Sequence, residues 1–441
     1  MSQKLSETAV PAGYKQTEVG VIPEDWGVRP LNSLLVEPPK YGINAPAVLL
    51  EGNLPVYIRI TDISSNGRFL PEKKVGVKSA FSHLYFLNEG DIVLARTGAS
   101  VGKSYLYDKN DGALVYAGFL IKVSPNSKKL SSKYLRQYLS TNTYWDWVII
   151  NSMRSGQPGI NGNQYGNLLV PYPELKEQTA IAQALSDVDA LINAQQQLIN
   201  KKQAIKTATM QQLLTGRTRL PAFAHHPDGS PKGYKHSELG EIPEDWEVVD
   251  FNFLFQDKTS KKIMHSHESV TFIGMQDVTE KAQLVSPKIL KFQELKSGFT
   301  YFEKGDVLVA KITPCFENGK GCHTKNLLTQ VGFGSTEFHV LRATHDSDSL
   351  FIYYWTTKQK FRKDLEAEMV GSAGHRRVPL SAIEKYKIAV PVKKEQTAIA
   401  TILSDMDEEI QALEQRLGKT RQIKQGMMQE LLTGKTRLPI T

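Results

Sequence analysis

The sequence KEQTAIA occupies residues 176–182 and returns unchanged at residues 394–400, which is 218 positions later. A second pair of segments has the same offset, with LLTGRTRLP at residues 213–221 and LLTGKTRLP at residues 431–439. Long matches at one constant offset indicate an internal repeat rather than chance. The sequence therefore predicts two homologous halves of about 220 residues each.

A third repeated segment shows how the copies are joined. GYKQTEVGVIPEDW stands near the N-terminus at residues 13–26, and GYKHSELGEIPEDW stands at residues 233–246. The chain ends with the motif that precedes this segment in its middle, so each terminus carries half of a junction whose intact copy is residues 216–245. We expect a circular arrangement with a pseudo-two-fold axis and adjacent termini.

Two segments of the repeat have the pattern of long helices. Residues 175–214 and 393–432 contain no proline, have apolar residues at helical spacing, and end in Thr-Gly, which suits a helix terminated by a left-handed glycine. Forty residues at about 1.5 Å each form a rod of roughly 60 Å. Because the apolar seam needs a partner, we expect the two helices to form an antiparallel coiled coil. The alternative is that each helix packs on its own globular domain.

The regions between the repeated segments diverge in sequence but keep a common skeleton. Shorter helices are expected at residues 131–153 and 349–370, with Ser131 and Asp348 as N-caps. The remaining sequence alternates β-rich runs such as VYIRI, DIVLAR, DVLVAKI and EFHVL with Gly, Asn and Pro turns. This pattern predicts two mixed α/β (α+β) domains that share a scaffold and differ at their surfaces.

Motifs for nucleotide or methyl-group chemistry are incomplete. GASVGKS at residues 98–104 resembles a phosphate-binding loop, but only three residues separate its glycines where four are required, and the following residues read as a strand. Its counterpart at residues 313–321 lacks the pattern. The EPPK sequence at residues 37–40 is not the Asn/Asp-Pro-Pro-aromatic loop of DNA methyltransferases. We therefore expect a glycine-rich hairpin here and no catalytic residues in the chain.

Two sets of residue types could suggest a metal site. Asp62, Glu72 and Lys74 form a loose nuclease-like pattern, which the second half does not reproduce beyond Asp277. The other set is Cys315, Cys322 and His323. Two cysteines without a second pair of ligands fall short of a structural zinc site. The sequence predicts no metal site.

Composition favours a polyanionic partner and excludes several protein classes. The 441 residues carry a formal net charge of +8, and lysine or arginine near a phosphate releases condensed counterions. No apolar run approaches the roughly 20 residues of a membrane span, and the N-terminus lacks the pattern of a secretory signal. With only two cysteines, the expected location is the cytoplasm, with no membrane association.

Two loops in each half are rich in side chains that read base edges and hold phosphates. Arginine suits guanine, and asparagine or glutamine suits adenine. The alternative is that these loops are only solvated surface. The candidate DNA-binding residues are Arg96, Thr97, Lys103, Arg154, Ser155, Gln157, Asn161 and Asn163 in the first half, and Lys311, Thr313, Lys320, His375, Arg376 and Arg377 in the second.

The repeated order of these motifs resembles the specificity subunit of type I restriction-modification enzymes. The resemblance rests on the GYK...IPEDW openings and on helices that begin KEQTAIA and end LLTG[RK]TRLP, and it covers essentially the whole chain. It implies target recognition domain 1 at residues 1–172, spacer helix 1 at 173–216, a linker at 217–245, target recognition domain 2 at 246–391, and spacer helix 2 with the C-terminal tail at 392–441.

The resemblance also implies a function. Each target recognition domain would read one half of a bipartite, asymmetric site in double-stranded DNA, while the helices set the spacing. Two modification methyltransferase subunits and two restriction (translocase) subunits would be the partners. S-adenosylmethionine, ATP and Mg²⁺ would belong to those partners, so this chain would be non-catalytic and hold no cofactor.

Two other classes stay open at this point. A stand-alone DNA-binding regulator would bind a specific sequence without a methyltransferase partner. A scaffold protein held together by its coiled coil would not bind DNA at all.

Overall fold

The structure is a computed structural model that describes residues 10–70, 72, 74–153, 156–257, 260–295, 297–372 and 374–439. The chain divides into two compact units. Unit 1 comprises Met1–Gln196 with Gln415–Thr441, and unit 2 comprises Gln197–Glu414. Unit 1 therefore contains both chain ends, whereas unit 2 is one continuous segment.

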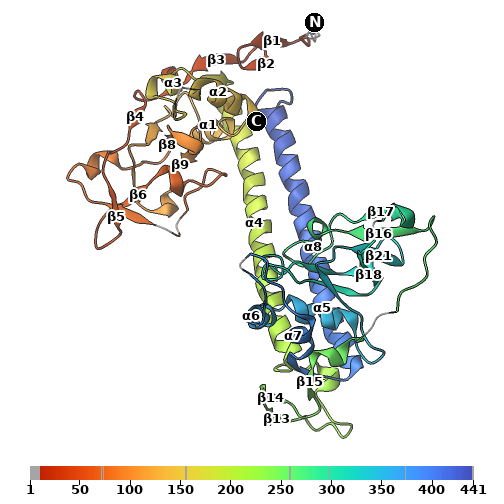
Figure 1. Cartoon of the computed structure of the whole chain (residues 1–441). Coiled ribbons are helices and arrows are strands. Elements are labelled where there is room, and N and C mark those ends of the chain that lie inside the picture. Colours follow the sequence, from red (N-terminus) through yellow and green to blue (C-terminus); the bar gives the residue numbers. More distant parts are fainter. Residues whose placement is uncertain are drawn as a thin grey trace. The chain divides into compact units, whose positions relative to one another are not determined.

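Two long helices run through both units, and each contributes one half to each unit (Figure 1). They are α4 (Leu175–Leu214) and α8 (Lys393–Leu431), so the predicted helices are confirmed to within one residue. Among the described residues, no helix is both long and apolar enough to cross a membrane.

Within each unit the two helix halves run antiparallel. In unit 1, Asp189 of α4 pairs with Lys424 of α8 at 2.8 Å between Oδ1 and Nζ, and Gln196, further along α4, accepts from Arg421, earlier in α8. In unit 2, Lys202 pairs with Glu409 at 2.6 Å, and Lys206 with Asp407. The predicted antiparallel pairing is confirmed in each unit, and the pseudo-two-fold axis between the units stays a prediction.

Ion pairs account for charged residues in the seam between the two long helices. Lys206 and Lys424 stand at equivalent seam positions, and each meets an aspartate of the other helix. Burial would raise the pKa of Asp189, but hydrogen bonds from Lys424 and Gln137, with the charges of Lys424 and Arg136, outweigh it. The pKa of Asp189 therefore lies below its ordinary value, and its carboxylate stays charged in the seam.

Unit 1 contains a mixed α/β domain. Two four-stranded sheets have the orders β10-β6-β7-β5 and β4-β11-β8-β9, with β6 and β10 parallel, and β1–β2 and β3–β12 form two-stranded pairs. Its strands are β1 (Tyr14–Thr17), β2 (Gly20–Pro23), β3 (Gly27–Pro30), β4 (Lys40–Tyr41), β5 (Ala47–Leu49), β6 (Val56–Ile58), β7 (Val75–Val77), β8 (Ile92–Ala95), β9 (Ser104–Leu106), β10 (Leu114–Tyr116), β11 (Leu120–Val123) and β12 (Leu169–Tyr172), and its short helices are α1 (Ser132–Tyr138), α2 (Asn142–Ser152) and α3 (Gly162–Gly166).

Unit 2 repeats this plan. Its sheets have the orders β17-β16-β21-β18 and β20-β19-β22, with β16 and β21 parallel, beside the pairs β13–β14 and β15–β23. Its elements are β13 (Tyr234–Ser237), β14 (Gly240–Pro243), β15 (Glu247–Asp250), β16 (Ser269–Ile273), β17 (Lys288–Lys291), β18 (Thr300–Glu303), β19 (Val307–Ala310), β20 (Gly321–His323), β21 (Val331–Gly334), β22 (Phe338–Leu341), β23 (Lys387–Val390), α5 (Ser349–Thr357), α6 (Gln359–Glu366) and α7 (Leu380–Glu384). The prediction of two mixed α/β domains on one scaffold is confirmed.

The prediction of one continuous short helix in each domain is wrong. Residues 131–153 form α1 and α2, and residues 349–370 form α5 and α6. The hydroxyl of Thr141 donates to Tyr138 O and accepts from Tyr144 N, so it ends one helix and caps the next. Lys358 interrupts the second pair with an extended backbone. The predicted N-caps, Ser131 and Asp348, are confirmed.

The repeated motifs meet in a junction that recurs in both units. In unit 2, Arg219 donates to Glu395 at 2.8 Å and to Asp245 at 2.7 Å, and the Trp246 indole donates to Glu395 at 3.2 Å. In unit 1, Arg437 bridges Glu177 and Asp25 in the same way, and Trp26 donates to Glu177 at 3.0 Å. The segments near the two chain ends therefore lie together, as predicted.

A glycine ends each long helix and fits closely into this junction. Gly216 and Gly434 both have φ of +70°, which confirms the left-handed termination expected from the Thr-Gly sequence. A Cβ at Gly216 would lie 2.6 Å from ring atoms of Pro243, and Pro23 leaves no more room at Gly434. The LLTG and IPEDW motifs recur together because each forms one side of this contact.

Candidate nucleic-acid interface

In each unit, the backbone joins the two loops that carry the predicted DNA-binding residues. In unit 1, Ile160 N donates to Arg96 O and Gly98 N donates to Pro158 O, both at 2.9 Å. In unit 2, Val378 N donates to Lys311 O and Thr313 N donates to Arg376 O, also at 2.9 Å. We call residues 96–98 with 156–161 the unit 1 loop pair, and residues 311–313 with 374–378 the unit 2 loop pair. The same backbone geometry thus presents different side chains.

Arg96 leads the unit 1 loop pair. Its guanidinium lies 4.7 Å from the ring centre of Tyr41, and that ring is 43% exposed. The Tyr41 hydroxyl accepts from Gly162 N at 3.0 Å, which holds the ring beside the loop pair. Stacking on an aromatic face fixes a guanidinium plane while leaving its edge available for recognition. Arg96 Nε is buried and has no hydrogen-bond partner among the described residues.

The other unit 1 candidates differ in how free their side chains are. Asn161 is partly committed, because its Oδ1 caps α3 by accepting from Gln164 N at 2.8 Å. Gln157 and Asn163 are exposed. Thr97 is half-buried and bridges to Gly159 through its backbone. Arg154 and Ser155 lie outside the described residues.

Gly98 allows the unit 1 loop pair to form. Its φ is +70°, and a Cβ added there would lie 2.9 Å from Gln157 Nε2. The segment around it forms a 3-10 turn at Gly98–Ser100 and continues into strand β9, so the prediction of a glycine-rich hairpin rather than a phosphate-binding loop is confirmed.

Lys103 lies apart from the loop pair. Its side chain lines a cavity of about 320 Å³ formed by the domain and both long helices of unit 1. Arg68, Arg136, Arg421 and Lys424 line the same cavity, and Asp189 supplies a negative charge there. Lys103 therefore belongs to a second basic surface of unit 1.

The unit 2 loop pair has a different charge pattern. Arg377 makes two hydrogen bonds to Glu337, at 2.9 and 2.8 Å, and these bonds hold the pKa of Glu337 below its ordinary value. Arg376 lies further from acids, at 3.8 Å from Glu317 and 4.0 Å from Glu366. Arg377 is exposed but engaged by Glu337, whereas Arg376 makes only the longer contacts and is freer to contact a ligand.

The remaining unit 2 candidates divide in the same way. Lys311 is half-buried and His375 is exposed. Thr313 donates its hydroxyl to Glu317, and Lys320 donates to Met275 O at 3.2 Å. Lys311, His375 and Arg376 are therefore the available polar side chains of the predicted set in this unit.

Three side chains at the interface were missed from the sequence. Tyr41 supports Arg96, as described above. Phe119 is 58% exposed, and its carbonyl accepts from Arg96 N at 3.0 Å. Glu337 occupies the equivalent place in unit 2, where its carbonyl accepts from Lys311 N at 2.9 Å. The available signal for Phe119 was its position directly after Gly118 and before a β-rich run.

Residues with possible catalytic or metal-binding roles have structural partners instead. Asp62 is buried and accepts two hydrogen bonds from the Arg59 guanidinium, at 2.9 and 2.8 Å. Cys322 is buried in the core of unit 2, and burial raises the pKa of its thiol to about 12. Among the residues that the structure describes, no three His, Cys, Asp or Glu side chains gather as a metal site.

Comparisons with known proteins agree with this architecture. The family model described as the type I restriction modification DNA specificity domain matches residues 23–202 and 243–425. The provisionally named type I restriction enzyme MjaX specificity subunit of Methanocaldococcus jannaschii is 29% identical, over 96% of this chain and 97% of that protein. The type I restriction enzyme EcoEI specificity subunit of Escherichia coli is 33% identical, over 38% of this chain and 28% of its own length.

A solved structure shares the fold. The S subunit of a type I restriction-modification system from M. genitalium superposes with a TM-score of 0.54, covering 94% of this chain and 97% of that chain at 15% identity. The two matched segments of the family model each contain one mixed α/β domain and most of the long helix that follows it.

Proposed function

The chain belongs to the type I restriction-modification DNA specificity family, and from this premise we propose that each unit reads one half of a bipartite, asymmetric site in double-stranded DNA. The observation that carries the proposal is the loop pair. Both units join the same two loops by the same backbone hydrogen bonds, yet the exposed side chains differ. Two recognition domains with the same backbone geometry and different exposed side chains suit two different half-sites.

The side chains support different readouts in the two units. In unit 1, the Arg96 guanidinium can donate to guanine or to phosphate, the Gln157 amide can pair with adenine, and the Phe119 ring can contact a thymine methyl group. In unit 2, Lys311, His375 and Arg376 offer hydrogen-bond donors, while Glu337 can accept from cytosine only if it leaves Arg377. Specificity then follows from the exposed groups, and phosphate contacts set the position.

The long helices would give this subunit its two other roles. We propose that α4 and α8 fix the spacing between the half-sites and dock two modification methyltransferase subunits, with two restriction subunits completing the complex. S-adenosylmethionine, ATP and Mg²⁺ would bind to those partners, and this chain would contribute recognition without catalysis. Such a complex would act on chromosomal DNA in the cytoplasm.

The family assignment favours this subunit role over a stand-alone DNA-binding regulator. A regulator would bind its site without forming a stable complex with a methyltransferase. Affinity purification of the full chain from its host, followed by identification of co-purifying subunits, distinguishes the two functions.

Half-site substitutions test the recognition proposal. Arg96→Ala should relax or weaken recognition at one half-site only, and Arg376→Ala should do so at the other, each by about 1–3 kcal/mol, because each removes a donor from one loop pair. Sequencing of methylated sites produced by the assembled complex measures both effects. Loss at both half-sites from either substitution would contradict the proposal, and Glu247→Ala, at an exposed position away from the loop pairs, is the matched control.

A length change tests the spacing role of the helices. Deleting residues 195–201 from α4 and 413–419 from α8 removes one heptad from each helix and shortens the rod by about 10 Å, or roughly three base pairs. The preferred spacer should change while both half-sites stay the same. An unchanged spacer in methylation-site sequencing would reject the role of the helices as a ruler.

A further inference from the structure

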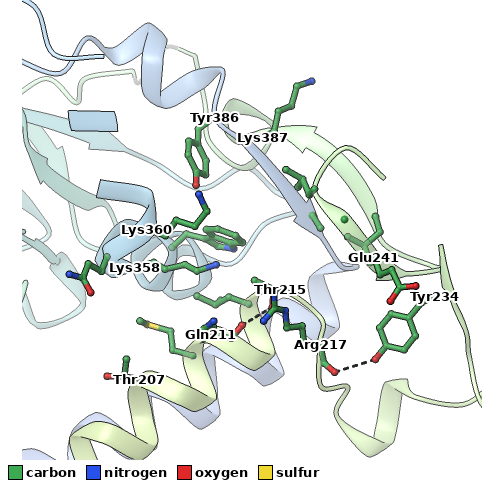
Figure 2. Close-up of a pocket in the computed structure, with 18 residues that line it drawn as sticks. Thr207, Gln211, Thr215, Arg217, Tyr234, Glu241, Lys358, Lys360, Tyr386 and Lys387 are labelled. Atoms are coloured by element: carbon green, nitrogen blue, oxygen red, sulfur yellow. Dashed lines mark hydrogen bonds between the residues drawn. The ribbon is translucent and has the colours of Figure 1, made fainter. Parts of the chain in front are cut away.

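Unit 2 contains a cavity of about 880 Å³ that the recognition loops do not use (Figure 2). It lies between the C-terminal end of α4, the β13–β14 hairpin and the turn that joins α5 to α6. One wall is apolar, and its size falls in the range of small-molecule sites. That wall is formed by Met210, Leu214, Leu239, Ile242 and Trp355.

Two cations reach this cavity without an acidic partner. Lys358 lies at the turn between α5 and α6, and Arg217 follows the end of α4; Figure 2 shows both side chains beside the cavity. Lys358 Nζ lies 4.2 Å from the ring centre of Trp355. No ion pair joins either side chain to an acid among the described residues. Unpaired cations beside an apolar wall favour an anionic ligand.

The other charged groups around the cavity are already engaged or lie apart. Lys360 pairs with Asp364 at 2.8 Å, and Lys387 pairs with Asp250 at 3.0 Å and extends away from the cavity in Figure 2. Glu241 lines the opposite side, on the hairpin. Burial, with the charges of Lys360 and Arg217, lowers the pKa of Lys358 to about 8, and Asp364 opposes that shift. The opposing charge, Asp364, already pairs with Lys360, so no carboxylate forms an ion pair with the Lys358 ammonium among the described residues.

The start of α6 adds further donors. Its N-cap is Lys358, and no side chain caps this helix. The N–H groups of an uncapped first turn attract anions, and phosphate is a common occupant of such positions. Trp355 is 5% exposed, and its indole N–H has no hydrogen-bond partner among the described residues.

Unit 1 shows what the same position looks like without these features. Ser131 N donates to Gln178 and Asp348 N donates to Gln396, so the short helices of the two units align with an offset of 217. Lys358 then corresponds to Thr141, whose hydroxyl caps α2 by accepting from Tyr144 N. Unit 1 satisfies this helix terminus with its own side chain, and unit 2 does not.

Trp355 also differs from its counterpart. The same offset aligns it with Tyr138, whose hydroxyl donates to Leu169 O at 2.8 Å. The donor in unit 1 is therefore paired, whereas the donor in unit 2 is not. The cation at the end of the long helix is retained, since Arg217 aligns with Lys435.

We propose that this cavity of unit 2 binds a phosphate ester with an apolar or aromatic body of nucleotide size. The phosphate would lie between Lys358 and Arg217 at the start of α6, with the body along the apolar wall. This site is separate from the unit 2 loop pair, because Arg376 lies near Glu366, at the opposite end of α6. An eight-residue helix separates the two by about 10 Å.

Calorimetric titration of the full chain with AMP, and separately with inorganic phosphate, tests the proposal. We expect saturable binding of AMP with one site per chain. Lys358→Thr, which installs the residue found in unit 1, should weaken AMP binding by about tenfold or more, as should Arg217→Gln, because each removes a charged donor. Lys387→Thr is the matched control and should change the affinity by less than about twofold.

Binding to a non-cognate DNA duplex identifies the source of the phosphate. If the ligand is a free nucleotide, AMP binding depends on Lys358 and the duplex affinity does not. If it is a DNA phosphate, Lys358→Thr weakens duplex binding, lowers the salt slope by about one, and AMP competes with the duplex. Either result supports the site.

The proposal is overturned if neither AMP, inorganic phosphate nor the duplex binds in a manner that depends on Lys358 and Arg217. Thermal unfolding excludes a trivial loss of structure. Because threonine restores a helix cap, Lys358→Thr should keep or raise the midpoint temperature. A purely structural role for Lys358 would instead lower that temperature and leave AMP binding of the folded protein unchanged.

Discussion

Unit 1 and unit 2 share one scaffold and differ in the side chains that their loops expose. Both bury the tryptophan and glutamate of a Trp–Glu–Arg junction, both end a long helix with a left-handed glycine against a proline, and both join two loops at the end of a central strand. At the loops, unit 1 has Arg96 with Tyr41 and Phe119, where unit 2 has Lys311 with Glu337. Packing geometry therefore restricts the residues of the shared scaffold and leaves the loop side chains free to differ.

The units also differ in which segments of the chain form the Trp–Glu–Arg junction. In unit 2 the junction lies within one continuous segment, from Arg219 to Asp245 and Glu395. In unit 1 it joins the two chain ends, from Arg437 to Asp25 and Glu177. The Arg–Asp contact spans 26 residues in unit 2 and 412 in unit 1, and the Arg–Glu contact spans 176 and 260 residues.

Removing the buried junction carboxylate is the strongest test of this equivalence. Glu395 and Glu177 are 1% and 2% exposed, and each accepts from an arginine and a tryptophan. Glu395→Ala should lower the free energy of unfolding of unit 2 by about 3–5 kcal/mol, because the buried Arg219 guanidinium loses its partner. Glu177→Ala should lower that of unit 1 by less, because the Arg437 side chain is 41% exposed. Hydrogen exchange resolved by peptide measures each unit separately. If only one of the two substitutions destabilises its own unit, the two junctions are not equivalent.

The two units should also differ in how much stability they lose at acid pH, and this difference should be smaller than the effect of removing Glu395. His323 accepts from Lys325 N through Nδ1, and burial with the charge of Lys325 lowers its pKa to about 4, with Asp348 opposing. Unfolded histidine titrates near pH 6.5, so the unfolded state binds the extra proton as the pH falls from about 6.5 to 4. Unit 2 should then lose roughly 1.4 kcal/mol per pH unit, or about 2 kcal/mol at pH 5.

Unit 1 has Leu106 at the corresponding place on its edge strand β9, opposite Ile92 of β8, as His323 on β20 is opposite Val307 of β19. His323→Leu should therefore remove this part of the acid sensitivity. Urea unfolding at pH 7 and pH 5 compares the two proteins. An equal drop in stability for both would assign the acid sensitivity to other groups.

Substituting the glycines that end the long helices should lower the stability of each unit. Gly216→Ala and Gly434→Ala should each cost about 2 kcal/mol, because alanine is strained at φ of +70° and its Cβ would overlap a proline ring. Gly240→Ala is the control, since its φ is +94° but nothing lies within 4 Å of an added Cβ. It should cost only about 1 kcal/mol in thermal unfolding. Equal costs at Gly216 and Gly240 would show that the proline contact contributes nothing.

Much of this frame could be predicted because it repeats. The repeat fixed the offset, the apolar period gave the bounds of α4 and α8 to within one residue, and Ser131 and Asp348 were recognisable as caps. The breaks within the short helices were missed because Thr141 and Lys358 do not prevent helix formation by themselves. Their effect depends on hydrogen bonds to specific neighbours and on the backbone direction that packing imposes.

The candidate interface was predictable as a set of loops and less so as individual side chains. Arg96 and Arg376 lie at the joined loops, but Lys103 lines another cavity and Arg377 is held by Glu337. Sequence order cannot show that a carbonyl of Phe119 or Glu337 meets the same loop, because β11 and β22 reach it through sheet pairing. Contacts between residues distant in sequence decide which charges remain available.

The division of the chain also sets the order in which the protein can be built by the ribosome. Unit 2 has all its residues once Glu414 has emerged, although it is encoded after most of unit 1. Unit 1 must wait for Gln415–Thr441, which supply Leu431 and Leu432 to its core and Arg437 to its junction. Domains usually complete their folding from the N-terminus during synthesis. Here the domain that is translated first is completed after the second one, because its core and junction need residues made after Glu414.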